Sequence, residues 1–573
     1  MKSSFLSQAG RALVPALPCL IFLAFFFGIP VFEILHGSLY GQDGSFGIEQ
    51  YQRMASTTVY VKVLWTTFLI SVLTALFSVL LGYPVAYFLS QLKMHSRGRW
   101  MIWLMIPFWT SYLVKTFAWL LVLSKTGVLS SVAVGLGLIS DPVAVVPSLT
   151  GVMIGMVHAM LPLAVMNMLP IMQSVNSQLV QAAETLGANR SVAFFSVFLP
   201  LSAPGAAAAG LLVFITSLGF FILPALLGGP QETMVAQLVI SSILELLNLP
   251  FAGALSTVLL ICAIGVFLLY DRLVGLSSLS GDAKAAAPRG KGRTRGLTIL
   301  VTAGRIFGQV GALFKPVLRS GHGLKAYVGV VVAMLSLPIL VVLPIAFTDS
   351  PFLEFPPKGF SLRWFEAFLF SPIWQAALLR SLGVATATAL AATALGLGAA
   401  LALTRVPSRW TKSLFAFLLA PLIVPRIVIA VGLFYLFARL GLNGTDLGLI
   451  IGHTVLAIPY VVVTMVAALK NFDWRLDDAA RILGASGTAR LRTVLLPMML
   501  PSLLAALQFA FIVSFDELTI AIFVSGGLKT TLPKQMWDDM ILQVNPTLAA
   551  VSVVLFLFIT LLVLIPTLFK SRK

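Results

Sequence analysis

Two adjacent carboxylates, Asp516 and Glu517, lie inside an apolar run that extends over residues 501–524. An ionisable side chain is costly at the depth of a bilayer, so each acid is a candidate for a functional role. Carboxylates and aromatic faces can replace the water around a cation, and Phe515 supplies such a face beside the pair. Neighbouring positions on a helix differ by about 100°, so we expect only one of the two acids to face a solute path squarely.

Other apolar runs carry aromatic and basic residues that could belong to the same path: Trp109, Tyr112, Lys115, Phe220 and Arg426. The two cations could neutralise the carboxylates when the path is closed, or they could line a route for an anion. The alternative for the charged residues is an internal ion pair that stabilises the helices. The residue types alone leave these alternatives open.

No set of residues in the sequence predicts catalysis or a resident metal. The cysteines, Cys19 and Cys262, both lie in apolar runs, and the five histidines have no ligand spacing. The sequence contains no G-x-x-x-x-G-K-[ST] phosphate loop, no H-E-x-x-H and no Ser/His/Asp set. We therefore expect no cofactor on this chain and no enzymatic activity of its own.

The composition fixes the broad class of fold. Hydrophobic residues make up 59% of the 573 residues and charged residues only 10%, more apolar side chain than a soluble fold of this size can bury. Uncharged runs of about 20 residues are what a helix needs to cross a bilayer. Barrel strands would alternate in polarity, which these runs do not. The sequence predicts an all-α polytopic membrane protein.

The apolar runs fall into two sets of six, which predicts about twelve transmembrane helices in two homologous halves. The first set covers residues 12–35, 63–92, 101–123, 148–172, 203–227 and 251–270. The second set covers residues 326–347, 378–404, 412–438, 448–469, 501–524 and 548–569.

Three domains follow from these runs: a first half over residues 1–270, a linker over 271–325 and a second half over 326–573. The linker contains ten Lys or Arg residues against two acids. Gly, Ala and Ser are plentiful within it, so we expect a basic and flexible cytoplasmic tether.

The formal net charge of +18 favours a topological role over nucleic-acid binding, because much of it lies between the apolar runs. Basic residues cluster at three places: Lys93, Arg97 and Arg99; Arg405, Arg409 and Lys412; and the C-terminal Lys570, Arg572 and Lys573. With twelve spans all three clusters fall on one side. We therefore expect both termini to be cytoplasmic.

One loop of each half repeats the same pattern. Residues 181–188 read Q-A-A-E-T-L-G-A, and residues 477–485 read D-D-A-A-R-I-L-G-A. Five residues recur at one constant offset: Ala182, Ala183, Gly187, Pro200 and Pro204 return as Ala479, Ala480, Gly484, Pro497 and Pro501. Parallel repeats in a membrane chain usually indicate a transporter with its pathway between the halves.

Each repeated segment predicts a short helix with a face of small residues, followed by a glycine that permits a turn. A smooth helix that projects into the cytoplasm is suited to a groove on another protein. A tight loop packed on its own bundle would explain a single copy. Two copies favour docking.

This pattern resembles the "EAA" loop of ABC importer permeases. The matching residues are Ala182, Ala183 and Gly187 in the first loop, and Ala479, Ala480 and Gly484 in the second. The family's leading Glu is replaced by Gln181 and by Asp478, of which only Asp478 keeps the charge.

The resemblance implies a type I ABC importer permease fold in the bacterial inner membrane, with both permease halves fused. Residues 173–200 and 470–498 would be coupling loops that rest on two ATP-binding cassette ATPase subunits. Those subunits would bind ATP and Mg²⁺, and a periplasmic substrate-binding protein would deliver a small solute.

Within that family the sequence is most similar to spermidine/putrescine-type permeases. The motifs are P-F-W-T-S-Y-L-V-K-T-F-A-W at 107–119, L-P-A-L-L-G-G at 223–229, S-F-D-E-L at 514–518 and T-L-P-K-Q-M-W at 531–537. A polyamine is therefore the expected solute. Permeases for ferric iron, thiamine, opines and phosphonates share parts of these motifs, so one of these solutes is an alternative. A second alternative is a different class of transporter, an ion-coupled secondary transporter.

Overall fold

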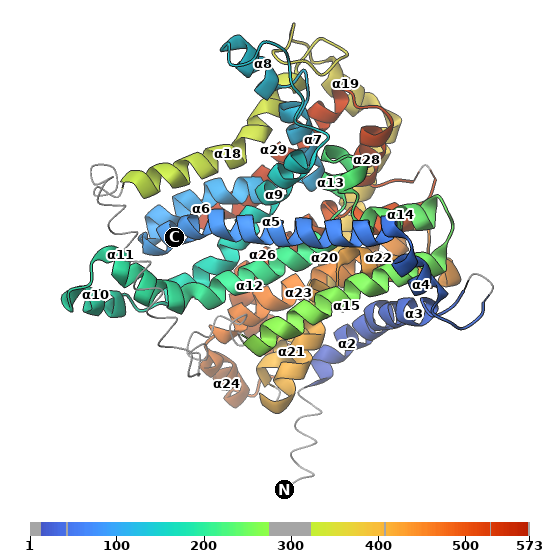
Figure 1. Cartoon of the computed structure of the whole chain (residues 1–573). Helices are drawn as coiled ribbons and strands as arrows, with labels where there is room; N and C mark the ends of the chain where they lie inside the picture. The colour runs from blue at the N-terminus through green and yellow to red at the C-terminus, as the bar shows by residue number, and fades with distance from the viewer. Residues whose placement is uncertain (1–12, 42–43, 274–321, 406–407, 528, 571–573) are drawn as a thin grey trace. The chain divides into compact units, whose positions relative to one another are not determined.

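The structure is a computed structural model that describes residues 13–41, 44–273, 322–405, 408–527 and 529–570 (Figure 1). Helices dominate this part of the chain, and pairing between extended segments is limited in it to three isolated bridges. Most of the predicted linker 271–325 lies outside the described residues, as do Arg572 and Lys573.

The predicted number of spans is confirmed. Eleven helices among the described residues are long and apolar enough to cross a membrane, and a bent pair makes a twelfth if it counts as one span. The eleven are Val14–Gly37, Thr58–Gln91, Tyr112–Gly135, Leu149–Ser174, Arg190–Leu218, Leu249–Arg272, Gly323–Ala346, Pro372–Thr404, Asp446–Lys470, Gly487–Phe515 and Thr547–Leu564.

Four predicted spans are continuously apolar in sequence, but in the structure each consists of two helices separated by a short non-helical break. The broken pairs are α6 (Met94–Trp109) with α7 (Tyr112–Leu123), α12 (Leu199–Leu218) with α13 (Ile222–Leu227), α21 (Ser408–Ile423) with α22 (Arg426–Leu440), and α26 (Leu496–Phe515) with α27 (Thr519–Val524). The α21–α22 pair bends by 93°. Ser111 begins α7 by accepting a hydrogen bond from the Leu113 amide, and Pro425 precedes α22. Hydropathy cannot reveal such breaks.

The other helices outside the repeated loops include the unbroken spans and the shorter helices that flank them. They are α2 (Leu17–Leu23), α3 (Ile29–Gly37), α4 (Glu49–Ser56), α5 (Thr58–Gln91), α8 (Val128–Gly135), α9 (Leu149–Ser174), α14 (Val235–Leu244), α15 (Leu249–Leu273), α18 (His322–Ala346), α19 (Arg363–Phe370), α20 (Pro372–Arg405), α23 (Asp446–Lys470), α28 (Leu532–Leu542) and α29 (Thr547–Lys570).

The two halves repeat the same packing around α9 and α23. The Ser148 and Thr445 side chains cap the two helices, accepting from the Gly151 and Gly448 amides at 3.1 Å and 3.0 Å. One turn later, Gly155 leaves so little room that a Cβ there would lie 2.7 Å from Leu223 of α13. A Cβ at Gly452 would lie 2.9 Å from Ile520 of α27. Small residues at this spacing let helix backbones approach closely in a membrane.

A second repeated contact joins each long helix to a short one. The Thr67 hydroxyl of α5 accepts a hydrogen bond from the Val235 amide, the first residue of α14, at 2.8 Å. In the second half, the Ser381 hydroxyl of α20 accepts from the Leu532 amide of α28 at 2.7 Å. Both bonds are buried, and each satisfies an amide at the start of a helix that has no partner within that helix.

The compact units of the chain are not its sequence halves. Unit 1 contains Met1–Thr58, Ala236–Leu260 and Ser361–Lys573, and unit 2 contains Val59–Val235 and Ile261–Phe360. Each unit therefore combines segments from both halves of the sequence.

In unit 1 the N-terminal helices pack on helices of the second half. Arg439 of α22 forms a 2.6 Å ion pair with Glu33 of α3, and the Tyr435 hydroxyl donates to the Leu249 carbonyl of α15. The rings of Phe26 and Phe437 meet edge to face.

In unit 2 the first helix of the second half, α18, packs on α6 and α7. The Tyr327 hydroxyl donates to the Leu81 carbonyl of α5 at 2.8 Å. Nε2 of His158, on α9, donates to the Leu335 carbonyl at 3.0 Å.

These exchanged contacts predict the outcome of cutting the chain within residues 274–321 and expressing both pieces. The pieces should copurify through a tag on either one, because each unit needs both. Each piece expressed alone should accumulate to a lower level, since its share of the interface is uncovered. If one piece alone is as abundant and as heat-stable as the whole chain, the packing described for the two units is wrong.

Candidate functional site

The first repeated loop is a short helix, α10 (Ser177–Thr185), closed by a left-handed turn. Asn176 begins it by accepting a hydrogen bond from the Gln178 amide at 2.9 Å. At its end the Gly187 and Ala188 amides donate to the carbonyls of Glu184 and Ala183. Gly187 has φ +89°, a conformation that favours glycine.

The second loop has the same construction. Asp473 begins α24 (Trp474–Ile482) by accepting from the Arg475 amide at 3.1 Å. The Gly484 and Ala485 amides donate to the carbonyls of Arg481 and Ala480, and Gly484 has φ +84°. The predicted pair of helix-and-glycine turns is therefore present in the structure.

The equivalence continues beyond the glycines. The Asn189 and Ser486 side chains cap α11 (Arg190–Ala193) and α25 (Gly487–Arg490). A π-helical turn follows in each loop, over Phe194–Phe198 and Leu491–Leu495, and leads into α12 and α26. The caps are chemically similar without being identical, so a comparison of identities alone missed them.

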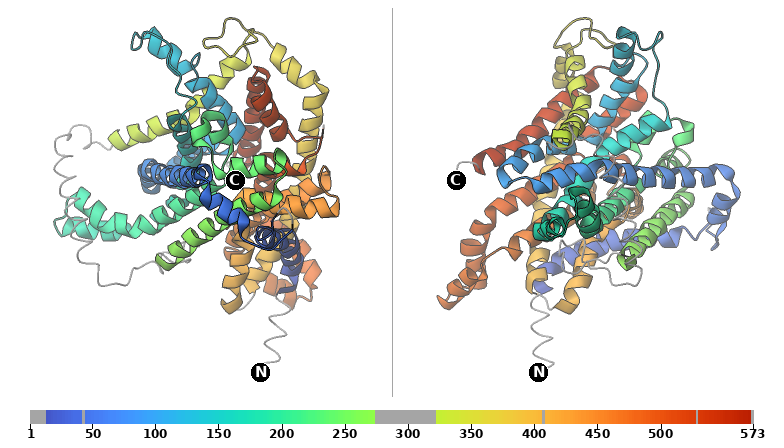
Figure 2. Two further views of the ribbon diagram at one scale, coloured as in Figure 1. Left: turned by 45° about the vertical axis from the view of Figure 1, so that its right-hand side comes forward. Right: turned by 60° about the vertical axis from the view of Figure 1, so that its left-hand side comes forward.

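The two loops present apolar side chains as well as small ones. Of the predicted docking residues, Gln181, Ala182, Asp478 and Ala479 are exposed, whereas Ala183 and Ala480 are half-buried. Leu186 and Leu483, at equivalent positions before the glycines, are 89% and 87% exposed. Sequence reasoning selected the alanines and missed these leucines, although both lie inside the repeated pattern. Figure 1 and the left view of Figure 2 show α10 beyond the ends of the neighbouring long helices of its unit.

The loops differ in the contacts that fix them, since the first is held by a helix outside the loop and the second by an ion pair within the loop. In the first, the Phe194 ring packs edge-on against Tyr87 of α5 at 5.1 Å between centroids. In the second, Arg490 forms a 2.7 Å ion pair with Asp477 of α24. Asp478 pairs with Arg481 at 3.3 Å on the exposed face, so its charge is partly balanced within the loop.

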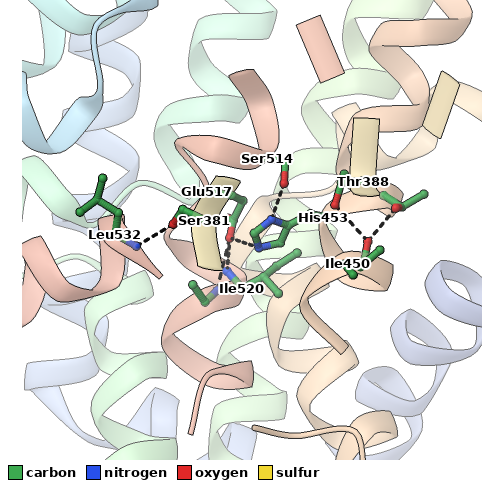
Figure 3. A network of polar contacts seen from close by, with 10 residues as sticks. Ser381, Thr388, Ile450, His453, Ser514, Glu517, Ile520 and Leu532 are labelled. Carbon is green, nitrogen blue, oxygen red and sulfur yellow. Dashed lines mark hydrogen bonds and ion pairs between the residues drawn. The ribbon is translucent and has the colours of Figure 1, made fainter. Parts of the chain in front are cut away.

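The second candidate site lies at the break between α26 and α27 in unit 1 (Figure 3). Glu517 is 1% exposed, and its Oε2 accepts from the Ile520 and Ala521 amides at 2.8 Å and 3.3 Å. Nε2 of His453, on α23, lies 3.6 Å from the same oxygen, and its Nδ1 shares a 2.8 Å hydrogen bond with the Ser514 hydroxyl. Glu517 therefore holds the start of α27 in place, which a sequence pattern could not indicate.

The expectation that Asp516 and Glu517 are neighbouring positions on one helix is wrong. Asp516 caps the end of α26 and Glu517 lies between two helices, so the 100° rule for neighbouring helical positions does not apply to them. Asp516 is half-buried, and Arg426 is close enough for its charge to act on Glu517. Phe515 packs on the Phe558 ring of α29.

The other four candidates lie together in unit 2. The Tyr112 and Phe220 rings meet edge to face at 5.0 Å, and Nζ of Lys115 lies 4.7 Å from the Tyr112 ring centroid. Trp109 is the last residue of α6, beside the Phe108 ring. The offset that relates Gly187 to Gly484 also relates Phe220 to Glu517, so these two occupy equivalent breaks.

The glycine turns yield a prediction about backbone strain. Gly187→Ala and Gly484→Ala add a Cβ that meets nothing within 4 Å, so their cost is the left-handed backbone alone, about 1–2 kcal/mol. Amides around that turn should then exchange with solvent roughly tenfold faster. The matched control is Gly487→Ala, which is equally unobstructed and lacks a positive φ. Equal effects at all three positions would contradict the assigned turn.

A further prediction concerns the buried carboxylate. Glu517→Ala leaves two buried amides without their acceptor and should destabilise the chain by about 1–3 kcal/mol, whereas Glu517→Gln keeps an oxygen and should cost less. Thermal unfolding of the purified chain measures both. A Glu517→Ala chain as stable as the wild type would show that Glu517 does not hold α27.

The fold and the repeated loops define an integral membrane transport subunit built from two related halves. The family model described as "Binding-protein-dependent transport system inner membrane component" matches residues 64–277 and again residues 392–573. The chain belongs to this family of transport permeases, and it is a multi-pass protein of the inner membrane.

Each of three curated relatives matches less than half of the chain. The spermidine/putrescine transport system permease protein PotB of Haemophilus influenzae is 31% identical over 261 residues, which is 44% of this chain and 91% of the relative. PotC of the same organism is 30% identical over 249 residues, 44% of this chain and 96% of the relative. PotB of Escherichia coli is 30% identical over 224 residues, 39% of this chain and 81% of the relative.

A solved bacterial alginate ABC transporter, in complex with an alginate pentasaccharide-bound periplasmic protein, is also similar. It is 18% identical with a TM-score of 0.39, and the match covers 46% of this chain and 93% of that one. This chain is about twice as long as its PotB and PotC relatives, as expected for a fused form with two permease halves.

Proposed function

We propose that this chain is the transmembrane permease of an ATP-driven importer that carries a polyamine, such as putrescine or spermidine, from periplasm to cytoplasm. The observation that supports this proposal best is the pair of equivalent loops. Each loop is a capped helix followed by a glycine turn, and each has a highly exposed leucine, Leu186 or Leu483. The polyamine assignment is supported by the names of the PotB and PotC relatives.

Two ATP-binding cassette ATPase subunits would dock at α10 and α24. Burial of exposed apolar surface favours association, and Leu186 and Leu483 would lose such surface to the ATPase subunits. The family's leading acid would have its counterpart in Asp478 and none in Gln181. ATP and Mg²⁺ would bind to those ATPases, a periplasmic binding protein would deliver the solute, and both chain termini would be cytoplasmic.

Transport would proceed by alternating access. Closure of the ATPases would displace the two loops, and α12 and α26, which continue from them, would carry that displacement to the helix breaks. The chain would thereby shift between inward-open and outward-open populations.

The helix breaks are where the solute would meet ionisable groups. A polyamine is a flexible polycation, and Asp516 with the second oxygen of Glu517 would replace part of its hydration. Glu517 Oε1 is buried and has no hydrogen-bond partner among the described residues, so it keeps capacity to accept from an ammonium group. The alternative is that Glu517 serves only to hold the start of α27. One carboxylate can do both, because Oε2 accepts from the α27 amides and Oε1 remains for the solute.

Two other functions predict different results. An ion-coupled secondary transporter would accumulate solute in a gradient without any ATPase. A permease for ferric iron, thiamine, an opine or a phosphonate would require ATP but would reject polyamines.

Uptake in proteoliposomes with the cognate ATPase and binding protein tests the proposal. We expect ATP-dependent uptake of radiolabelled spermidine or putrescine, and none without ATPase. Leu186→Asp and Leu483→Asp should reduce uptake and ATPase copurification at least about tenfold, since a buried carboxylate at the contact is costly.

The matched control is Leu542→Asp on α28, a leucine that is 82% exposed and far along the chain from either loop. It should leave ATPase copurification unchanged. Normal ATPase binding by the Leu186 and Leu483 variants would exclude the proposed docking surface, and gradient-driven uptake without ATPase would favour the secondary transporter.

A further inference from the structure

Unit 2 contains a buried ammonium group in an apolar helix. Lys115 is on α7 and is 1% exposed. Its Nζ donates to the Phe108 carbonyl at 3.2 Å and lies 4.7 Å from the centroid of the Tyr112 ring. An ammonium removed from water needs replacement for its hydration, and these two groups supply part of it.

The carbonyl is available because α6 ends there. The helix stops at Trp109, and the Thr110 amide and hydroxyl both bond back to the Ile106 carbonyl. The last carbonyls of a helix lose their intrahelical donors and form the negative end of its dipole. The Phe108 carbonyl therefore offers a cation both a hydrogen-bond acceptor and a favourable potential.

The aromatic face is held in position from the neighbouring break. The edge contact with Phe220, which lies between α12 and α13, fixes the Tyr112 ring. A cation over the face of a tyrosine is attracted by the ring quadrupole, more strongly where water is excluded.

We propose that the Phe108 carbonyl and the Tyr112 ring form a binding site for a primary alkylammonium ion, which the Lys115 side chain occupies from within the chain. A lysine side chain is a butylammonium group attached to the backbone. The end of an aliphatic diamine carries the same group, so a solute ammonium can use this site only when Lys115 leaves it. That last step rests on the proposed polyamine function, whereas the ammonium site itself does not.

Chemical rescue tests the site without any transport measurement. Lys115→Ala removes the ammonium group and all of its alkyl chain except Cβ, and added n-butylammonium should raise the thermal unfolding temperature of the purified full chain by a few degrees. Butan-1-ol, which has the same carbon chain and no charge, should not. The matched control is Leu113→Ala, a buried residue of the same helix, which should gain nothing from n-butylammonium.

Equal responses to n-butylammonium and butan-1-ol, or equal rescue of the Leu113→Ala chain, would overturn the proposal. If Lys115→Ala does not accumulate, Lys115→Met keeps the volume and removes the charge. Combined with Tyr112→Leu, it should lower the unfolding temperature by less than the sum of the single changes, because both remove the same contact. Additive losses would contradict an ammonium held by the tyrosine ring.

A third measurement separates the ammonium site from the proposed function. Lys115→Ala should bind 1,4-diaminobutane several-fold more tightly than the wild type, since the tethered competitor is gone. Rescue by n-butylammonium combined with no polyamine uptake by the wild type would retain the site and reject the polyamine function. Polyamine uptake by the wild type without any rescue of Lys115→Ala would retain the polyamine function and reject the ammonium site.

Discussion

The need to satisfy backbone polar groups within the bilayer controls this structure. Four spans are interrupted, and every interruption frees amides and carbonyls that lipid cannot satisfy. Side chains take over where the helices stop: Glu517 accepts from two amides at the start of α27, and Lys115 donates to the carbonyl end of α6. The charged residues of the spans are thus explained first by the breaks. A solute that contacts Glu517 or Lys115 would therefore meet side chains that also stabilise the fold.

Continuous helices connect the two repeated loops to the helix breaks. Each loop continues through a π-helical turn into a helix, α12 or α26, that ends at a break. Each loop is therefore connected along a single helix to the residues next to Phe220 or Glu517. The first helix of each half lies in the unit that holds most of the other half, so each compact unit combines helices from both halves of the sequence.

Much of this could be predicted from the sequence, and the remainder could not for physical reasons. Hydropathy predicted the spans, and the recurrence of Ala182, Ala183 and Gly187 predicted the loops, since both signals are local. Leu186 and Leu483 were missed because exposure depends on where the whole loop projects. The break beside Asp516 was missed because α26 and α27 are equally apolar, and the exchanged packing was missed because it depends on contacts between distant segments.

We propose that Leu186 and Leu483 face the cytoplasm and contact ATPase subunits. Single cysteines at these positions, in a chain with Cys19 and Cys262 replaced, can be labelled with a membrane-impermeant maleimide in oriented vesicles. We predict labelling in inside-out vesicles only, with protection when the cognate ATPase is bound. Labelling in right-side-out vesicles, or labelling that bound ATPase does not reduce, would contradict the account.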